Sequence, residues 1–160
     1  MESTPGAGSV FRITLPCASP DVEVGDARRD ELVRGEGDVL LVEDDAMVSA
    51  TAKATLRSLG YRVTHASDGQ AALAAVRAEP ARFRLVLLDL RMPGMSGEAT
   101  FNALSELAPS LPVLLWSGYG AEQDVDAMLQ RGAVGFVQKP YTVAELGRTI
   151  AKALERGAAY

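Results

Sequence analysis

Six charged or hydroxyl side chains follow short apolar runs of the sequence, at the points where buried strands would end. They are Glu43, Asp44 and Asp45 after "DVLLV", Asp89 after "RLVLL", Ser117 after "PVLLW" and Lys139 after "GFVQ". In an open sheet of parallel strands, ligands bind outside the carboxyl ends of the strands, which share one edge. We therefore expect four strand ends to bring acids, a hydroxyl and an ammonium together.

The chemistry of such a group is restricted by its charges. Carboxylates within a few ångströms of one another repel, and each raises the pKa of the others unless a cation neutralises them. Mg²⁺ suits this set because it takes carboxylate oxygens, keeps several waters and also binds phosphate oxygens. A carboxylate can attack phosphorus while a metal and an ammonium stabilise the charge on the transferring oxygens. The pattern predicts phosphoryl chemistry, with Asp89 as nucleophile and Lys139 as positive charge.

Each residue of the group also has an ordinary structural interpretation. Asp44 or Asp45, placed before a helix, would act as an N-cap, and Asp89 before "RMPG" would start a turn. Ser117 before a glycine would be a cap or turn residue, and Lys139 a solvated surface residue. Capping and turn formation can explain the acids and the serine, but they do not explain why the last strand ends in a lysine. Taken together, the six residues therefore favour a functional site.

Short strands alternate with longer amphipathic helices in the segment that must position these residues. The expected strands are 38–43, 61–66, 84–89, 111–117 and 133–139, and helices are expected near 48–59, 68–79, 97–108, 121–131 and after Thr142. In the last helix, Thr142 and Glu145 have the spacing of a capping box, and Gly60 follows the first helix as a stop signal. The alternation predicts a parallel sheet covered by helices on both faces.

Composition limits the class of protein. The chain has 160 residues, of which 48% are hydrophobic, so it is long enough for one globular domain. The single cysteine, Cys17, excludes an internal disulfide, and no apolar run approaches the roughly 18–20 residues of a membrane span. The first residues lack the features of a secretory signal. A net charge of −5 without a basic cluster argues against nucleic-acid binding. We expect a cytoplasmic protein without membrane contact.

The first 37 residues differ in character from the rest. Residues 16–37 are rich in charge, glycine and proline without a sustained period, which is typical of a linker. Before it, Phe11, Ile13 and Leu15 alternate behind a glycine-rich turn, so we expect a single strand there. One strand is too little for a domain.

At residues 38–157 the sequence resembles the receiver domain of two-component response regulators. The resemblance rests on "LLVEDD", "LVLLDLRMPGMSG", "LLWSGYG" and "GFVQKPY", in this order. It implies the flavodoxin-like (βα)5 fold, a doubly wound parallel five-stranded sheet of order 2-1-3-4-5. The implied activity is Mg²⁺-dependent (or Mn²⁺-dependent) acceptance of a phosphoryl group from the phosphohistidine of a histidine kinase or histidine phosphotransfer domain.

The resemblance also assigns roles. Asp89 matches the phosphoacceptor, and Lys139 the phosphate-contacting lysine before a proline whose peptide bond is commonly cis. Asp44 and Asp45 match the acidic pair, with Asp45 as direct metal ligand and Asp44 acting through water, and the backbone carbonyl of Arg91 would be a further ligand.

The family's switch residues have counterparts here as well. Ser117 matches the switch hydroxyl and Phe136 the switch aromatic, although an aromatic residue in an apolar strand is also ordinary core. Arg91 and Tyr119 would lie near the phosphoryl group and modulate its lifetime. Output would use the surface of the last two helices and the last strand, with exposed candidates Tyr119, Tyr141 and Val143. A homodimer is a further mode of output.

Residues 1–15, which hold nearly all of the segment "ESTPGAGSVFRITLP", resemble the last strand of a histidine-kinase ATP-binding domain. This resemblance implies that this chain is the C-terminal receiver of a hybrid histidine kinase, a parent that can be membrane-associated. No output domain is expected after the last helix, so output would pass through protein contacts or phosphotransfer. His65, the only histidine, lies at a strand end and is expected to be a surface or edge residue, not a phosphodonor.

Three other functions compete with that of a signalling module, which is not an enzyme in the ordinary sense. A metal-dependent phosphatase or hydrolase would also use Asp89, but "DLRMP" lacks a second aspartate two residues later. A binding scaffold without chemistry would not need every key position. A dinucleotide-binding domain fits less well, because acids follow the first strand where glycines should contact pyrophosphate.

Overall fold

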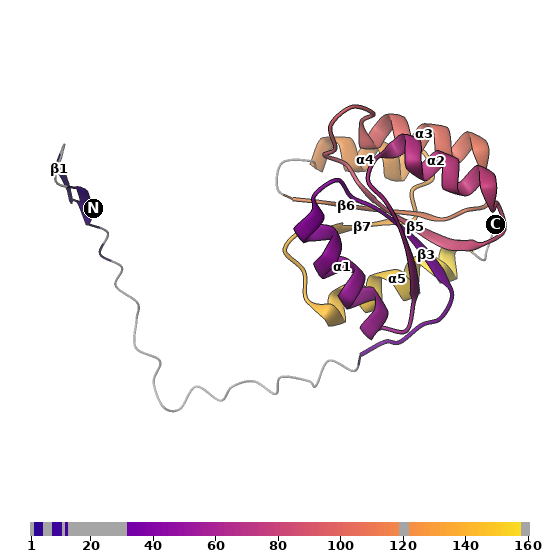
Figure 1. Ribbon diagram of the computed structural model, residues 1–160, viewed down its shortest axis with the longest axis horizontal. Coiled ribbons are helices and arrows are strands. Elements are labelled where there is room, and N and C mark those ends of the chain that lie inside the picture. Colours follow the sequence, from indigo (N-terminus) through magenta and orange to yellow (C-terminus); the bar gives the residue numbers. More distant parts are fainter. Residues whose placement is uncertain (1, 5–7, 11, 13–31, 119–121, 158–160) are drawn as a thin grey trace. The chain divides into compact units, whose positions relative to one another are not determined.

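The computed structural model describes residues 2–4, 8–10, 12, 32–118 and 122–157 (Figure 1). The chain divides into two compact units, residues 1–30 and 31–160. In the first unit, strands β1 (Glu2–Thr4) and β2 (Gly8–Val10) pair in antiparallel orientation. The strand expected at Phe11, Ile13 and Leu15 and most of the expected linker lie outside the described residues.

The second unit is built on a five-stranded parallel sheet within the described residues, in the order β4-β3-β5-β6-β7. The strands are β3 (Asp38–Val42), β4 (Arg62–Ala66), β5 (Phe83–Asp89), β6 (Val113–Ser117) and β7 (Gly135–Gln138). Numbered within this sheet alone, the order is 2-1-3-4-5. This confirms the predicted flavodoxin-like fold, with strand ends within two residues of those expected.

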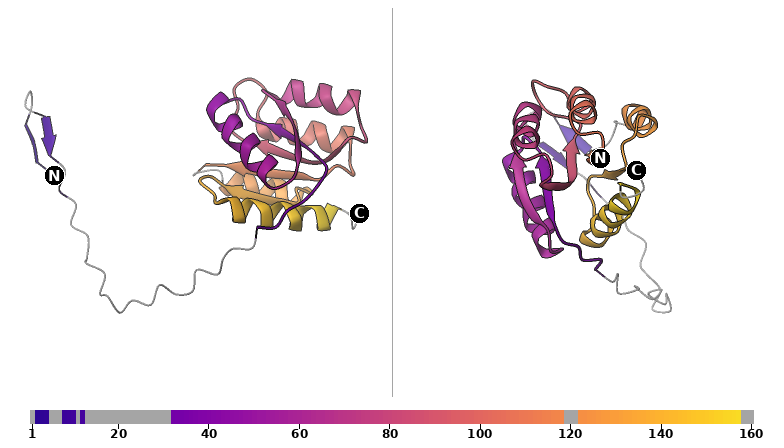
Figure 2. Two further views of the ribbon diagram at one scale, coloured as in Figure 1. Left: turned by 60° about the horizontal axis from the view of Figure 1, so that its bottom comes forward. Right: turned by 90° about the vertical axis from the view of Figure 1, so that its right-hand side faces the viewer.

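Helices cover both faces of the sheet (Figures 1 and 2). They are α1 (Ala46–Ser58), α2 (Gly69–Ala78), α3 (Gly97–Leu107), α4 (Glu122–Gln130) and α5 (Val143–Gly157). Leu56 of α1 and Ile150 of α5 are buried in one core cluster, whereas Leu73 of α2, Leu104 of α3 and Met128 of α4 belong to the other. The sheet is therefore buried on both faces, which leaves the ends of its strands accessible to a ligand.

Local signals in the sequence determine where two helices begin. At α5, the predicted capping box is present: the Thr142 N–H donates to Glu145 Oε2 at 2.8 Å, and the Glu145 N–H donates to Thr142 Oγ1 at 3.2 Å. At α1, the Asp45 carboxylate is the N-cap. Gly60 after α1 has a φ of 101°, a left-handed conformation that favours glycine, as its predicted stop role requires.

The described end of the expected linker is attached to the second unit. The Gly35 N–H donates to the Leu59 carbonyl at 2.9 Å, and the Arg62 N–H donates to the Gly37 carbonyl at 2.9 Å. These bonds extend the compact unit before β3. Within the described ranges, no helix combines the length and apolar composition that crossing a bilayer requires.

Candidate functional site

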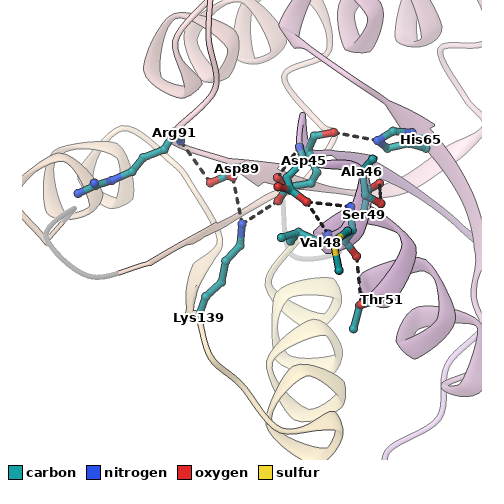
Figure 3. Close-up of polar contacts among 11 residues, drawn as sticks. Asp45, Ala46, Val48, Ser49, Thr51, His65, Asp89, Arg91 and Lys139 are labelled. Atoms are coloured by element: carbon teal, nitrogen blue, oxygen red, sulfur yellow. Dashed lines mark hydrogen bonds and ion pairs between the residues drawn. The ribbon is translucent and has the colours of Figure 1, made fainter. Parts of the chain in front are cut away.

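The strand ends bring the expected acids and lysine to one place. Asp89 is the last residue of β5 and only 5% exposed. Its Oδ1 accepts a hydrogen bond from the Arg91 N–H at 3.2 Å, and its Oδ2 lies 3.0 Å from Lys139 Nζ. Figure 3 shows the Lys139 side chain reaching from the end of β7 toward Asp89. A buried carboxylate is thus held between a backbone donor and an ammonium.

Lys139 connects two of the acids. Its ammonium donates to Glu43 Oε2 at 2.7 Å as well as to Asp89. Glu43 is 1% exposed, and its other oxygen accepts a hydrogen bond from the Asp45 N–H at 3.1 Å. Burial raises the pKa of the Glu43 carboxyl, and the Lys139 ammonium opposes this shift. The lysine therefore supplies part of the charge balance of the site.

Three carboxylates could hold a metal ion. Ligand oxygens of Glu43, Asp44 and Asp89 all lie within 4.8 Å of one another; Asp44 is exposed and the other two are buried. Oxygen ligands of this kind, with one side open to water, fit a hard divalent cation that keeps several waters. The donor set therefore suits Mg²⁺ or Mn²⁺.

Asp45 has a different place from the one expected of a direct metal ligand. Its Oδ1 accepts hydrogen bonds from the N–H groups of Met47 and Val48, both at 2.8 Å, so the carboxylate caps α1. Among the described residues, the group that could hold a metal contains Glu43 and not Asp45. The N-cap interpretation of Asp45 therefore describes the structure. The acids that face Asp89 are Glu43 and Asp44, one residue earlier than the predicted pair.

The two expected switch residues lie on the strands that follow Asp89 in the sheet, Ser117 on β6 and Phe136 one strand further, on β7. Ser117 ends β6, next to β5, and is fully buried; its hydroxyl has no hydrogen-bond partner among the described residues. This hydroxyl is free to serve a new acceptor. Phe136 of β7 is half-buried and packs against the core cluster under α2, α3 and α4.

The two expected modulators are placed differently. The Arg91 side chain extends away from Asp89 and Lys139, although the Arg91 backbone N–H donates to the Asp89 carboxylate (Figure 3). Tyr119 lies outside the described residues. His65 is exposed on the edge strand β4, as predicted, and its Nε2 lies 2.8 Å from the Glu43 carbonyl oxygen.

An apolar groove of about 510 Å³ opens beside the lysine, between the start of α1 and the connection from β7 to α5. The Lys139–Pro140 peptide bond at its wall is cis. The residues that line the groove are Met47, Val48, Thr51, Thr55, Lys139, Pro140, Tyr141 and Val143. Met47 and Val143 are large apolar side chains exposed to solvent here.

Comparison with known proteins agrees with this geometry. Residues 39–151 match the family model of the response regulator receiver domain. The chain therefore belongs to the receiver-domain family of two-component response regulators, which is a family of signalling modules.

Individual relatives show how much of each protein is shared. The transcriptional regulatory protein ZraR of Salmonella typhimurium is 37% identical over 123 residues, which cover 77% of this chain and 27% of that protein. The two-component response regulator ORR41 of Oryza sativa is 35% identical over 116 residues, covering 71% of this chain and 91% of that protein. A receiver domain of Clostridium thermocellum has the same fold, with a TM-score of 0.73, 23% identity and coverage of 77% of this chain and 98% of that one. This chain thus spans about a quarter of ZraR.

Proposed function

We propose that residues 38–157 form a phosphoacceptor receiver that takes a phosphoryl group from a phosphohistidine onto Asp89, with Mg²⁺ or Mn²⁺ as cofactor. The observation that carries this proposal is the position of Asp89. It is a buried carboxylate 3.0 Å from an ammonium and within 4.8 Å of two further acids. A carboxylate that only started a turn or lay on the surface would not need to be buried beside an ammonium and two other carboxylates.

The proposed step transfers one group and needs no other reactant. A carboxylate oxygen of Asp89 attacks phosphorus, the bond from phosphorus to the donor imidazole nitrogen breaks, and an acyl phosphate forms while the imidazole takes up a proton from the surrounding water. Lys139 supplies positive charge to the phosphoryl oxygens. Glu43, Asp44, Asp89 and the backbone carbonyl of Arg91 are the groups that would hold the cation. When bound, the cation adds positive charge next to the transferring oxygens.

The switch follows from the new charge at the end of β5. A dianionic phosphoryl group on Asp89 offers acceptors to the free Ser117 hydroxyl, and movement of Ser117 leaves room for Phe136 to turn inward. The affected surface comprises α4, β7 and α5 and includes Tyr141 and Val143. A change of population between two arrangements is enough for output.

The donor would be a histidine kinase or a histidine phosphotransfer domain in the cytoplasm, and the output a protein contact, phosphotransfer or homodimerisation. We further propose that the parent protein is a hybrid histidine kinase. The likeness of residues 1–15 to the end of a kinase ATP-binding domain supports this origin. Sequencing the reading frame upstream of Met1 tests it: a kinase catalytic domain is the expected result, and its absence contradicts the origin without affecting the receiver.

The phosphoacceptor proposal is tested by intact mass spectrometry after incubation with acetyl phosphate and Mg²⁺. We expect an adduct of one phosphoryl group that requires the cation and is absent in Asp89→Asn. If a control receiver reacts and this protein forms no adduct, then either its acyl phosphate is hydrolysed rapidly or the protein is a scaffold that does not accept a phosphoryl group. Titration with beryllofluoride separates these outcomes, since a scaffold does not bind it.

A further inference from the structure

Trp116, the only tryptophan of the chain, lies directly beside the acceptor. It precedes Ser117 in β6 and pairs with Asp89 in the parallel register of β5 and β6. Its side chain is fully buried in the core cluster beneath α1 and α5.

The indole contacts the lysine of the site. Lys139 Nζ lies 3.9 Å from the centroid of the Trp116 ring, while its carboxylate contacts with Glu43 and Asp89 are 2.7 and 3.0 Å long. A cation over the face of an aromatic ring is attracted by the ring quadrupole, and tryptophan gives the strongest such contact. The ammonium therefore has acidic partners and an aromatic partner.

The aromatic partner differs from the acids in what it does during phosphorylation. Glu43 and Asp89 are themselves proposed to bind the cation and the phosphoryl group, so their attraction for Lys139 changes as the site is occupied. The indole is neutral and binds neither. Its attraction for the ammonium can therefore persist throughout the reaction and offset part of the rotamer entropy that the flexible lysine side chain loses on being ordered.

We propose that Trp116 is a positioning residue, whose ring face holds the Lys139 ammonium toward Asp89 for phosphoryl transfer. This inference rests on the proposed role of Asp89 as acceptor. Trp116 acts only through Lys139 and touches no reacting atom in this scheme.

The orientation of the indole is consistent with this role. Trp116 Nε1 is buried and has no hydrogen-bond partner among the described residues, so packing and ring contacts determine where the ring lies. One such contact is the Tyr141 ring, whose centroid is 5.9 Å away. Phenylalanine keeps an aromatic face and removes the unpaired donor. Trp116→Phe is therefore the conservative variant, and Trp116→Leu removes the face altogether.

The first measurement is direct and does not depend on phosphorylation. The lysines of the chain are Lys53, Lys139 and Lys152, so their ε-methylene signals can be assigned by NMR. Protons above an aromatic ring are shielded, so we expect the Lys139 signal upfield of the other two. It should move toward them in Trp116→Leu and remain partly shifted in Trp116→Phe. A Lys139 signal at the position of the other lysines in the wild type overturns the contact.

The second measurement is the rate of phosphorylation by acetyl phosphate. We expect Trp116→Leu to lose about 3- to 30-fold in rate, the range that corresponds to a cation–π contact, and Trp116→Phe to recover part of the loss. Leu114→Ala is the matched control, because Leu114 is a fully buried residue of β6 in the same core cluster. Leu114→Ala should lower the stability of the protein, but its folded fraction should be phosphorylated at the wild-type rate.

A double-mutant cycle decides whether Trp116 acts through the lysine. In a Lys139→Met background, Trp116→Leu should have no further effect on the rate. An equal loss in both backgrounds, or an unchanged rate in Trp116→Leu, overturns the proposal. Failure of the wild type to form any adduct would instead refute the acceptor role of Asp89, which is a separate outcome.

Discussion

Removal of the Asp89 charge is expected to stabilise the metal-free protein. Asp89→Asn keeps the size of the side chain and one carbonyl oxygen for the Arg91 N–H, but it eliminates a buried negative charge. Loss of the proposed acceptor would then increase stability, because its carboxylate belongs to a cluster of like charges that folding does not require.

The magnitude follows from the distances. At an effective dielectric constant of about 20, two unit charges 4.8 Å apart, the upper limit within the acid group, repel by about 3.5 kcal/mol. Asp89 has two such neighbours, Glu43 and Asp44. Its attraction to Lys139 at 3.0 Å is about 5.5 kcal/mol by the same rule. The repulsions together exceed the attraction, and the amide is also less costly to bury, so we expect a gain of about 1–3 kcal/mol.

Urea unfolding with and without Mg²⁺ measures both parts of this expectation. Without the cation, Asp89→Asn should unfold at higher urea than the wild type. With Mg²⁺ at about 100 times its dissociation constant, the wild type should gain about 2.7 kcal/mol, and the variant much less. Glu106→Gln, an exposed change on α3, is the control for loss of one negative charge. A metal-free Asp89→Asn protein less stable than the wild type would refute the reasoning.

Three further predictions test other parts of the structure. Hydrogen bonding from Arg62 holds the pKa of Asp38 below its ordinary value of 3.8. The stabilisation that Asp38 contributes is therefore present above that value and is lost as the pH falls through the pKa of the folded state. Asp38→Asn should reduce the loss of unfolding free energy at acid pH, and an unchanged loss would contradict this expectation. Gly97→Ala should lower the free energy of unfolding, measured with urea, by about 1–3 kcal/mol, because a Cβ would meet the backbone between β5 and α3. A variant as stable as the wild type would show that this backbone can move to accommodate the Cβ. Asp45→Ala should lower the free energy of unfolding by about 1 kcal/mol, but this variant should still be stabilised by Mg²⁺. Asp44→Asn should no longer be stabilised by Mg²⁺. The reverse result would identify Asp45 as the metal ligand.

The fold could be predicted because its signals are local. Apolar runs of strand length, helices with one apolar face and the Thr142–Glu145 capping box depend on residues close together in the chain. Asp89 and Lys139 could be placed at the site for a related reason, since each ends a strand of a parallel sheet and such ends share an edge.

The choice among Glu43, Asp44 and Asp45 could not be made in this way. All three follow the same strand, and a shift of one residue decides whether a carboxylate faces the neighbouring strand end or turns back to cap α1. Only the packed geometry of β3 and α1 makes that choice, and it assigns Asp45 to the cap.

The sequence by itself determined the alternation of strands and helices, the sheet edge that holds the site, and the presence of Asp89 and Lys139 at that edge. The tertiary structure alone decided which acids accompany Asp89 and that the Trp116 ring lies under the Lys139 ammonium. Residues 43, 89, 116 and 139 are far apart in the chain. Their distances depend on the twist and register of four strands, which no local pattern specifies.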